Sequence, residues 1–177
     1  MRSVIETLAF TTIMACLLAC QVHAADNLSF KGVLVAQACT IRPGDELIPV
    51  KFSDISTSSL YLNTRTPGEP FYIHLQDCDT HIADSVTVTF SGAENAELPG
   101  LLALGTGSVA RGIAIGLETA TDQLLPLNAP SPEQALNEGD NVISLKAYVR
   151  GEPKAIANES IRKGRFVANS TFTLAYP

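Results

Sequence analysis

Polar and apolar side chains alternate with a period of two through most of the chain after residue 24. The alternation is clearest in the segments 71–75, 85–90, 113–117 and 142–149, with 49–52 as a shorter candidate. Each such run predicts a strand with one buried face, because successive side chains of a strand point to opposite sides of a sheet. Turn residues at 66–68, 98–100 and 105–107 separate the runs, and 132–136 could form a single helical turn. This organisation predicts an all-β sandwich or barrel.

The final strand carries the clearest pattern. One register contains a glycine, small residues and large apolar residues: Gly164, Phe166, Ala168, Ser170, Phe172, Leu174 and Tyr176. The other register is mostly polar and suits solvent, with Arg165, Asn169, Thr171 and Thr173. We therefore expect this strand either to be central in a sheet or to need a partner at its edge.

The first 24 residues are typical of a secretion signal. Arg2 precedes an apolar run over residues 8–19, and Val22-His23-Ala24 has small residues at the usual cleavage spacing. The run is too short for a membrane-spanning helix, which needs about 20 residues. An alternative interpretation is a lipoprotein signal, because Leu17-Leu18-Ala19-Cys20 resembles a site at which the cysteine is lipidated.

Residues 25–35 repeat the alternating pattern. Leu28, Phe30, Gly32 and Leu34 share one register. Ten extended residues span about 33 Å, which is enough to run the length of another domain. Gly32 suits a point where two backbones approach closely. Spacing alone also allows the simpler interpretation that both terminal segments are ordinary strands of one self-contained sandwich.

The composition, net charge and cysteine count limit the classes of function that this chain could have. Removing 24 of the 177 residues leaves 153, enough for one domain, and the net charge of −6 gives no electrostatic reason to bind nucleic acid. An exported chain that retains Cys39 and Cys78 predicts a disulfide, with two buried thiols as the alternative. His74, Asp77, Asp79 and His81 cluster in sequence, but we interpret them as a polar loop. No catalytic motif, metal site or cofactor site is predicted.

Both ends resemble the subunits of chaperone–usher pili, of the type 1 and P-pilus kind, and especially minor tip-fibre pilins. The segment from Leu28 to Ile41 is similar to their N-terminal arm, with Gly32 seven residues before Cys39. The end from Gly164 to Tyr176 is similar to their C-terminal signature, a glycine fourteenth from the end and a penultimate tyrosine. One departure is Asp26, which stands where many such arms carry an apolar residue.

The resemblance implies an incomplete immunoglobulin-like sandwich of six strands that lacks strand G and is completed by a donor strand. It divides the chain into a signal peptide (1–24), a donor-strand extension (25–35) and a pilin domain (36–177). Leu28, Phe30, Gly32 and Leu34 would form the donor strand, while the strand of Gly164, Phe166, Phe172, Leu174 and Tyr176 would bind the chaperone and line the groove. The implied partners are a periplasmic chaperone, an outer-membrane usher and neighbouring subunits, with the final location in an extracellular fimbrium.

The predicted function is therefore a structural fimbrial subunit that polymerises by donor-strand exchange and supports cell adhesion. One alternative is a tip-associated adhesin or adaptor with direct receptor contact. A separate receptor-binding domain does not fit into 153 residues, and tip adhesins lack a donor arm. The remaining alternative is a secreted enzyme or a periplasmic lipoprotein, which the mass of the mature N-terminus would distinguish.

Overall fold

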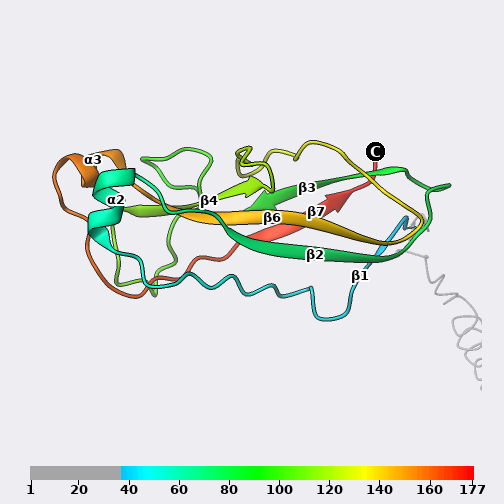
Figure 1. Cartoon of the computed structure of the whole chain (residues 1–177), viewed down its shortest axis with the longest axis horizontal. Coiled ribbons are helices and arrows are strands. Elements are labelled where there is room, and N and C mark those ends of the chain that lie inside the picture. Colours follow the sequence, from blue (N-terminus) through cyan, green and yellow to red (C-terminus); the bar gives the residue numbers. More distant parts are fainter. Residues whose placement is uncertain (1–36) are drawn as a thin grey trace, which may run out of the picture. The chain divides into compact units, whose positions relative to one another are not determined.

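Two antiparallel sheets form the body of the chain (Figure 1). The computed structural model describes residues 37–177, which belong to the second of two units, Met1–Val35 and Ala36–Pro177. The elements, in chain order, are β1 (Thr40–Ile41), α2 (Thr57–Asn63), β2 (Glu69–Cys78), β3 (Ser85–Ser91), β4 (Ile113–Thr119), β5 (Gln134–Ala135), β6 (Gly139–Gly151), α3 (Pro153–Ala157) and β7 (Thr171–Ala175). The predicted signal peptide and donor residues lie outside the described residues.

The larger sheet has the strand order β1-β2-β6-β4. In its centre Ile73 lies opposite Ile143, and Ile115 lies opposite Val149 on the next pair of strands. These side chains are buried, while Tyr72 and Ser144 of the intervening register are exposed. The alternation seen in the sequence therefore separates a core face from an outer face.

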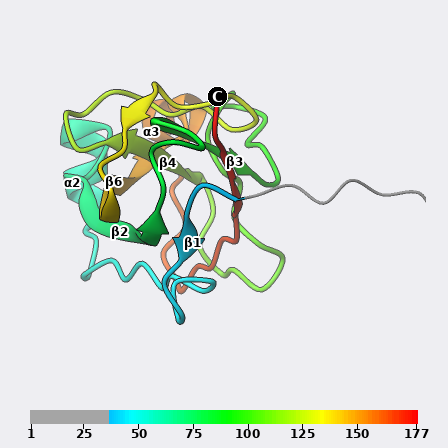
Figure 2. The ribbon, with the colours of Figure 1, turned by 90° about the vertical axis from the view of Figure 1, so that its right-hand side faces the viewer.

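The smaller sheet has the order β5-β3-β7 and covers the core face of the larger one (Figure 2). Aromatic contacts join the layers: the rings of Phe71 and Phe90 are 6.2 Å apart and nearly perpendicular. Phe90 also lies 6.5 Å from Phe172 within the smaller sheet. The core is thus continuous from β2 to the C-terminal strand, and the predicted all-β sandwich is confirmed.

Three local expectations were wrong. The segment 132–136 contains β5 instead of a helical turn, because Gln134 and Ala135 pair with Val86 and Ser85. Two short helices, α2 and α3, were not expected and lie together at one end of the domain (Figure 1). Residues 49–52 belong to no sheet of the described chain, although their exposure alternates as in a strand.

A second small cluster packs on the outer face of the larger sheet. Leu98 and Leu101 cover Ala114 and Tyr148 there. Beside them, the guanidinium of Arg65 lies 3.7 Å from the centre of the Tyr148 ring.

No helix among residues 37–177 is long and apolar enough to cross a membrane.

Candidate functional site

The C-terminal segment has one bonded edge and one open edge. Residues 171–175 of β7 pair with 87–91 of β3. Just before β7, Arg165 and Val167 accept backbone hydrogen bonds from Val109 at 2.8 Å and from Gly105 at 2.7 Å. Within residues 37–177, no strand pairs with the other edge of β7. The open edge therefore offers a row of backbone donors and acceptors to another strand.

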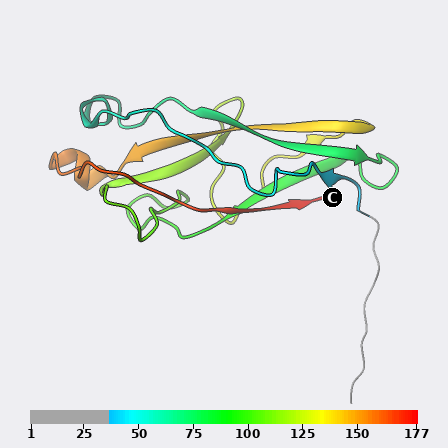
Figure 3. The same cartoon turned by 90° about the horizontal axis from the view of Figure 1, so that it is seen from below.

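The segment 47–55, between β1 and α2, runs along the length of the domain, as does the C-terminal segment (Figures 1 and 3). Ile48, Val50 and Phe52 are half-buried, while Pro49 and Lys51 between them are exposed. This is the alternation of a strand, yet the segment makes no backbone hydrogen bond to any other described residue. The exposure of its side chains alternates as in a strand, but no other segment of the described chain pairs with it.

Apolar side chains from both segments form what we call the apolar seam. They are half-buried against the core rather than enclosed in it. Its members are Ile48, Val50, Phe52 and Ile55 on one side, and Phe166, Ala168, Phe172, Leu174 and Tyr176 on the other. The Phe52 and Phe166 rings meet across the seam, with centroids 5.9 Å apart. An apolar strip beside an unpaired strand edge is a typical site of strand addition.

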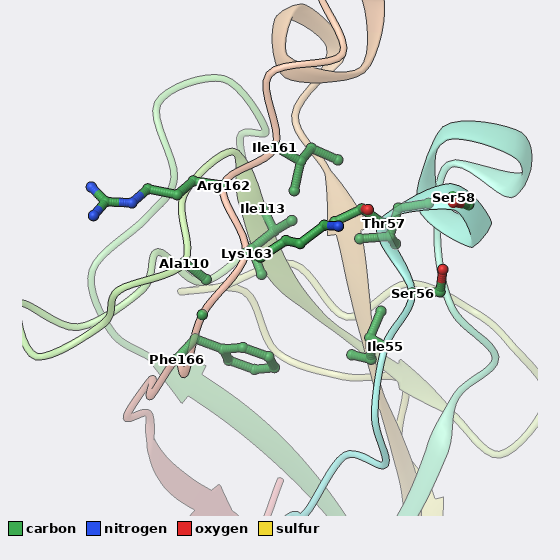
Figure 4. A pocket seen from close by; sticks show the side chains of 12 residues that line it. Ile55, Ser56, Thr57, Ser58, Ala110, Ile113, Ile161, Arg162, Lys163 and Phe166 are labelled. Carbon is green, nitrogen blue, oxygen red and sulfur yellow. The ribbon is translucent and has the colours of Figure 1, made fainter.

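A pocket of about 300 Å³ lies at the Gly164 end of the seam (Figure 4). Its apolar lining consists of Ile55, Leu60, Ala110, Ile113, Ile161 and Phe166. Its polar lining comes from Ser56, Thr57, Ser58, Arg162 and Lys163. The pocket therefore combines an apolar interior, large enough for one aliphatic side chain, with a hydroxyl-bearing and cationic rim.

Gly164 itself is required by the packing. Its φ of +150° is rare for other residues, and a Cβ there would lie 2.6 Å from Val109 Cγ1. The glycine lets the C-terminal segment pass close to residues 109–110 before it enters the seam. The predicted groove-strand residues Gly164, Phe166, Phe172, Leu174 and Tyr176 thus lie along one continuous line.

At the opposite end of the seam, the hydroxyl of Tyr176 is buried and has no hydrogen-bond partner among the described residues. Burial raises the pKa of this phenol. An unpaired buried hydroxyl lowers the stability of the fold by about 1–3 kcal/mol. The core at this end therefore contains a polar group that lacks a hydrogen bond.

The disulfide between Cys39 and Cys78 joins the start of the described chain to the end of β2. Both cysteines are buried. Nearby, the carboxylate of Asp45 accepts hydrogen bonds from the backbone N–H of His74 at 2.8 Å and contacts its ring Nδ1 at 2.7 Å. Burial opposes ionisation of Asp45, but these bonds and Arg42 outweigh it and lower its pKa. These contacts fix the turn that leads from β1 into segment 47–55.

Sequence reasoning missed one partly buried ion pair. The guanidinium of Arg65 donates two hydrogen bonds of 2.9 Å to Glu118, which is 1% exposed. Glu118 is 53 residues from Arg65, so no local pattern could have connected them.

The predicted donor residues Leu28, Phe30, Gly32 and Leu34 lie outside the described residues.

Comparison with known proteins shows the family. The protein-family model described as "Fimbrial protein" matches residues 28–177 of this chain. A putative minor fimbrial subunit of Proteus mirabilis, PmfF, is 36% identical over 152 residues, which cover 85% of this chain and 84% of that protein. The fimbrial adapter PapK of Escherichia coli is 33% identical over 162 residues, covering 86% and 88% of the two chains.

Solved structures agree on the fold. The P pilus rod subunit PapA superimposes with a TM-score of 0.68 at 21% identity, covering 80% of this chain and all of that one. A subunit from the structure of a chaperone–usher pilus gives a TM-score of 0.67 at 21% identity, covering 88% and 97%. The fold is accordingly the immunoglobulin-like sandwich with a missing strand. The chain belongs to the fimbrial protein family and is a structural subunit of an extracellular fimbria.

Proposed function

We propose that this subunit polymerises by strand exchange: residues 25–35 form a donor strand, and the apolar seam accepts the donor strand of another subunit. The observation that carries the proposal is the open edge of β7 beside segment 47–55, with half-buried apolar side chains on both sides. A single inserted strand would bond to β7 and cover these side chains. Because the arm and the seam are different surfaces, the contact is head-to-tail and generates a fibre.

The direction of the inserted strand follows from the sheets. Every strand pair in the described chain is antiparallel, and an antiparallel addition continues that pattern. An arm with the pattern of residues 25–35 then lies with its Leu34 position in the pocket beside Gly164 and its Leu28 position towards Tyr176. The Gly32 position falls between them, where a missing side chain allows the backbones to approach.

The arm supplies its binding energy through a few side chains. Each large apolar residue buried contributes about 1.5–3 kcal/mol, so Leu28, Phe30 and Leu34 together contribute on the order of 5–9 kcal/mol before backbone bonding. The Tyr176 hydroxyl and the open edge of β7 gain polar neighbours from the same strand. Insertion thereby covers the apolar side chains that are only half-buried in the single subunit, and so completes the core.

Before assembly, a periplasmic chaperone occupies the seam, and the outer-membrane usher exchanges its strand for the arm of the next subunit. The chaperone strand pairs along Phe166 to Tyr176, with Phe172 and Leu174 in the apolar contact. Residues 1–24 direct export and are removed, and residues 36–177 form the pilin domain. The role is structural, without catalysis, and supports adhesion through the fimbria.

A second candidate role is that of an adaptor between two parts of a fimbria. It is favoured by the 33% identity to the fimbrial adapter PapK over 86% of this chain. An adaptor accepts one subunit type and donates to another, so it requires the same arm and seam. Direct receptor contact at a fimbrial tip has no specific observation in its favour.

Co-expression with and without a cognate periplasmic chaperone tests the proposal. The expected result is a soluble one-to-one complex with the chaperone, and degradation or aggregation without it. Removal of residues 25–34 should leave the chaperone complex intact but prevent docking onto the preceding subunit. A soluble monomer in the absence of chaperone would contradict the proposal, and a lipidated Cys20 in place of a mature start at Ala25 would support the lipoprotein alternative.

A further inference from the structure

The rim of the pocket beside Gly164 carries a positively charged side chain in a distinctive position. In Figure 4, Lys163 extends across the pocket and its ammonium points towards Thr57 of α2, whereas Arg162 points away. The apolar side chains of Ile55, Ile113 and Phe166 lie around the same space. Any strand that fills the pocket must pass beneath or beside the Lys163 ammonium.

This charge is not compensated by the described part of the chain. The ion pairs found among residues 37–177 involve Arg42, Arg65, His74, Lys146 and Lys154. None of them involves Lys163, Arg162 or Arg165. Lys163 and Arg162 both line the pocket, in a chain whose net charge is −6. The mouth of the pocket is therefore complementary to an anionic group.

We propose that Lys163 makes this pocket select a donor arm in which the apolar residue that fills the pocket is flanked by Asp or Glu. This inference rests on the strand exchange proposed above. In an inserted strand, the pocket-filling side chain points into the seam and its two sequence neighbours point outward. Lys163 is exposed at the rim of the pocket, so a carboxylate at either neighbouring position comes within its reach.

The chain's own arm does not have this chemistry. Leu34 is flanked by Val33 and Val35, and the nearest charge is the like-charged Lys31. The nearest carboxylate, Asp26, is eight residues before Leu34, or about 27 Å along an extended strand. The subunit therefore accepts the arm of a different subunit more readily than its own, which favours a junction in the fibre over a long run of identical copies.

The test uses the full mature chain in complex with its chaperone and synthetic arm peptides of residues 25–36. The peptides are the parent sequence, Val33→Glu, Val35→Glu and the uncharged controls Val33→Gln and Val35→Gln. Incorporation rates are measured by fluorescence at low and at high salt. At low salt at least one Glu peptide should enter about two- to five-fold faster than its Gln control, as an exposed ion pair allows. The advantage should disappear at high salt and in Lys163→Gln, but persist in the control variant Lys154→Gln.

Each result decides a different point. If no peptide enters the complex, the strand exchange itself is contradicted, and with it this inference. If the peptides enter but Glu and Gln peptides do so at the same rate, only the role of Lys163 is overturned. The same holds if the Glu advantage survives in Lys163→Gln. A reversed preference, in which Lys163→Glu takes up a Val33→Lys peptide faster than the Glu peptide, supports the inference independently of any general loss of folding.

Discussion

The rings of Phe52 and Phe166 lie 5.9 Å apart, although the two segments that carry them share no backbone hydrogen bond in the described chain. Two extended segments normally meet through a ladder of hydrogen bonds or through a strand that lies between them. Here only side chains meet, at the Gly164 end. The relationship marks the place where the sandwich lacks a strand, and the account of assembly depends on it.

Replacing Phe166 with alanine should weaken binding of an arm peptide. Phe166 is half-buried and lines both the seam and the pocket, so we expect a loss of about 2 kcal/mol, or about 30-fold in the dissociation rate of the peptide. The matched control is Val167→Ala, in the next residue, which is exposed on the opposite face. Equal effects of the two changes on peptide dissociation would contradict the assignment of the seam.

Stability predictions are best measured on an arm-complemented chain, defined as residues 36–177 followed by a flexible linker and residues 25–35. In it, Arg65→Ala should lower the free energy of unfolding by about 1–3 kcal/mol, because the buried Glu118 carboxylate loses the hydrogen bonds from a partly exposed guanidinium. The control Lys154→Ala breaks an exposed pair with Glu97 and should have no measurable effect. Replacing both Arg65 and Glu118 with apolar residues should recover much of the loss, and a full loss in that variant would argue against charge burial as the cause.

Gly116→Ala should also destabilise the arm-complemented chain. A Cβ at Gly116 would collide with the ring of the buried Tyr148, which itself lies beneath Arg65. Overpacking of this kind costs about 1–3 kcal/mol. Gly107→Ala is the control, since its Cβ would be no closer than 3.9 Å to any neighbour. Urea unfolding midpoints compare the two, and a harmless Gly116→Ala would mean that Tyr148 moves freely.

Asp45 should make stability depend on pH at acid values. Its pKa in the fold lies below the ordinary value of 3.8, so its contribution is present above that value and is lost as the pH falls through the folded pKa. The difference in free energy of unfolding between the parent and Asp45→Asn should therefore shrink between about pH 5 and about pH 3. Asp54→Asn, at an exposed position of the adjoining segment, is the control. A difference that stays constant over this range would contradict the role of the Asp45–His74 contact.

Local alternation predicted the strands well, because burial of one face imposes a period of two whatever the partner. The same reasoning placed Phe166, Phe172, Leu174 and Tyr176 in one register, as they are in the structure. It also detected the strand-like pattern of residues 49–52, but alternation does not say whether a partner exists. No strand among residues 37–177 pairs with that segment. It therefore shows the alternating exposure of a strand without a ladder of backbone hydrogen bonds.

Features that depend on distant residues could not be predicted. The pocket beside Gly164 is assembled from Ile55, Ile113 and Ile161, which come from three separate parts of the chain. The polar sequence of α2, Thr57-Ser58-Ser59, has weak intrinsic helix preference and gave no signal. The short α3 begins with Pro153 at its first turn, which is a favourable start but resembles a turn in isolation.

The most direct measurement is the unfolding of residues 36–177 with and without residues 25–35 tethered at the C-terminus. With the arm attached, the account predicts a soluble monomer with one cooperative urea transition and slow exchange of the β7 amide protons. Without the arm and without a chaperone, it predicts aggregation or a non-cooperative transition. A soluble monomer that unfolds cooperatively with equal stability in both forms would contradict the claim that this body requires a strand from another polypeptide.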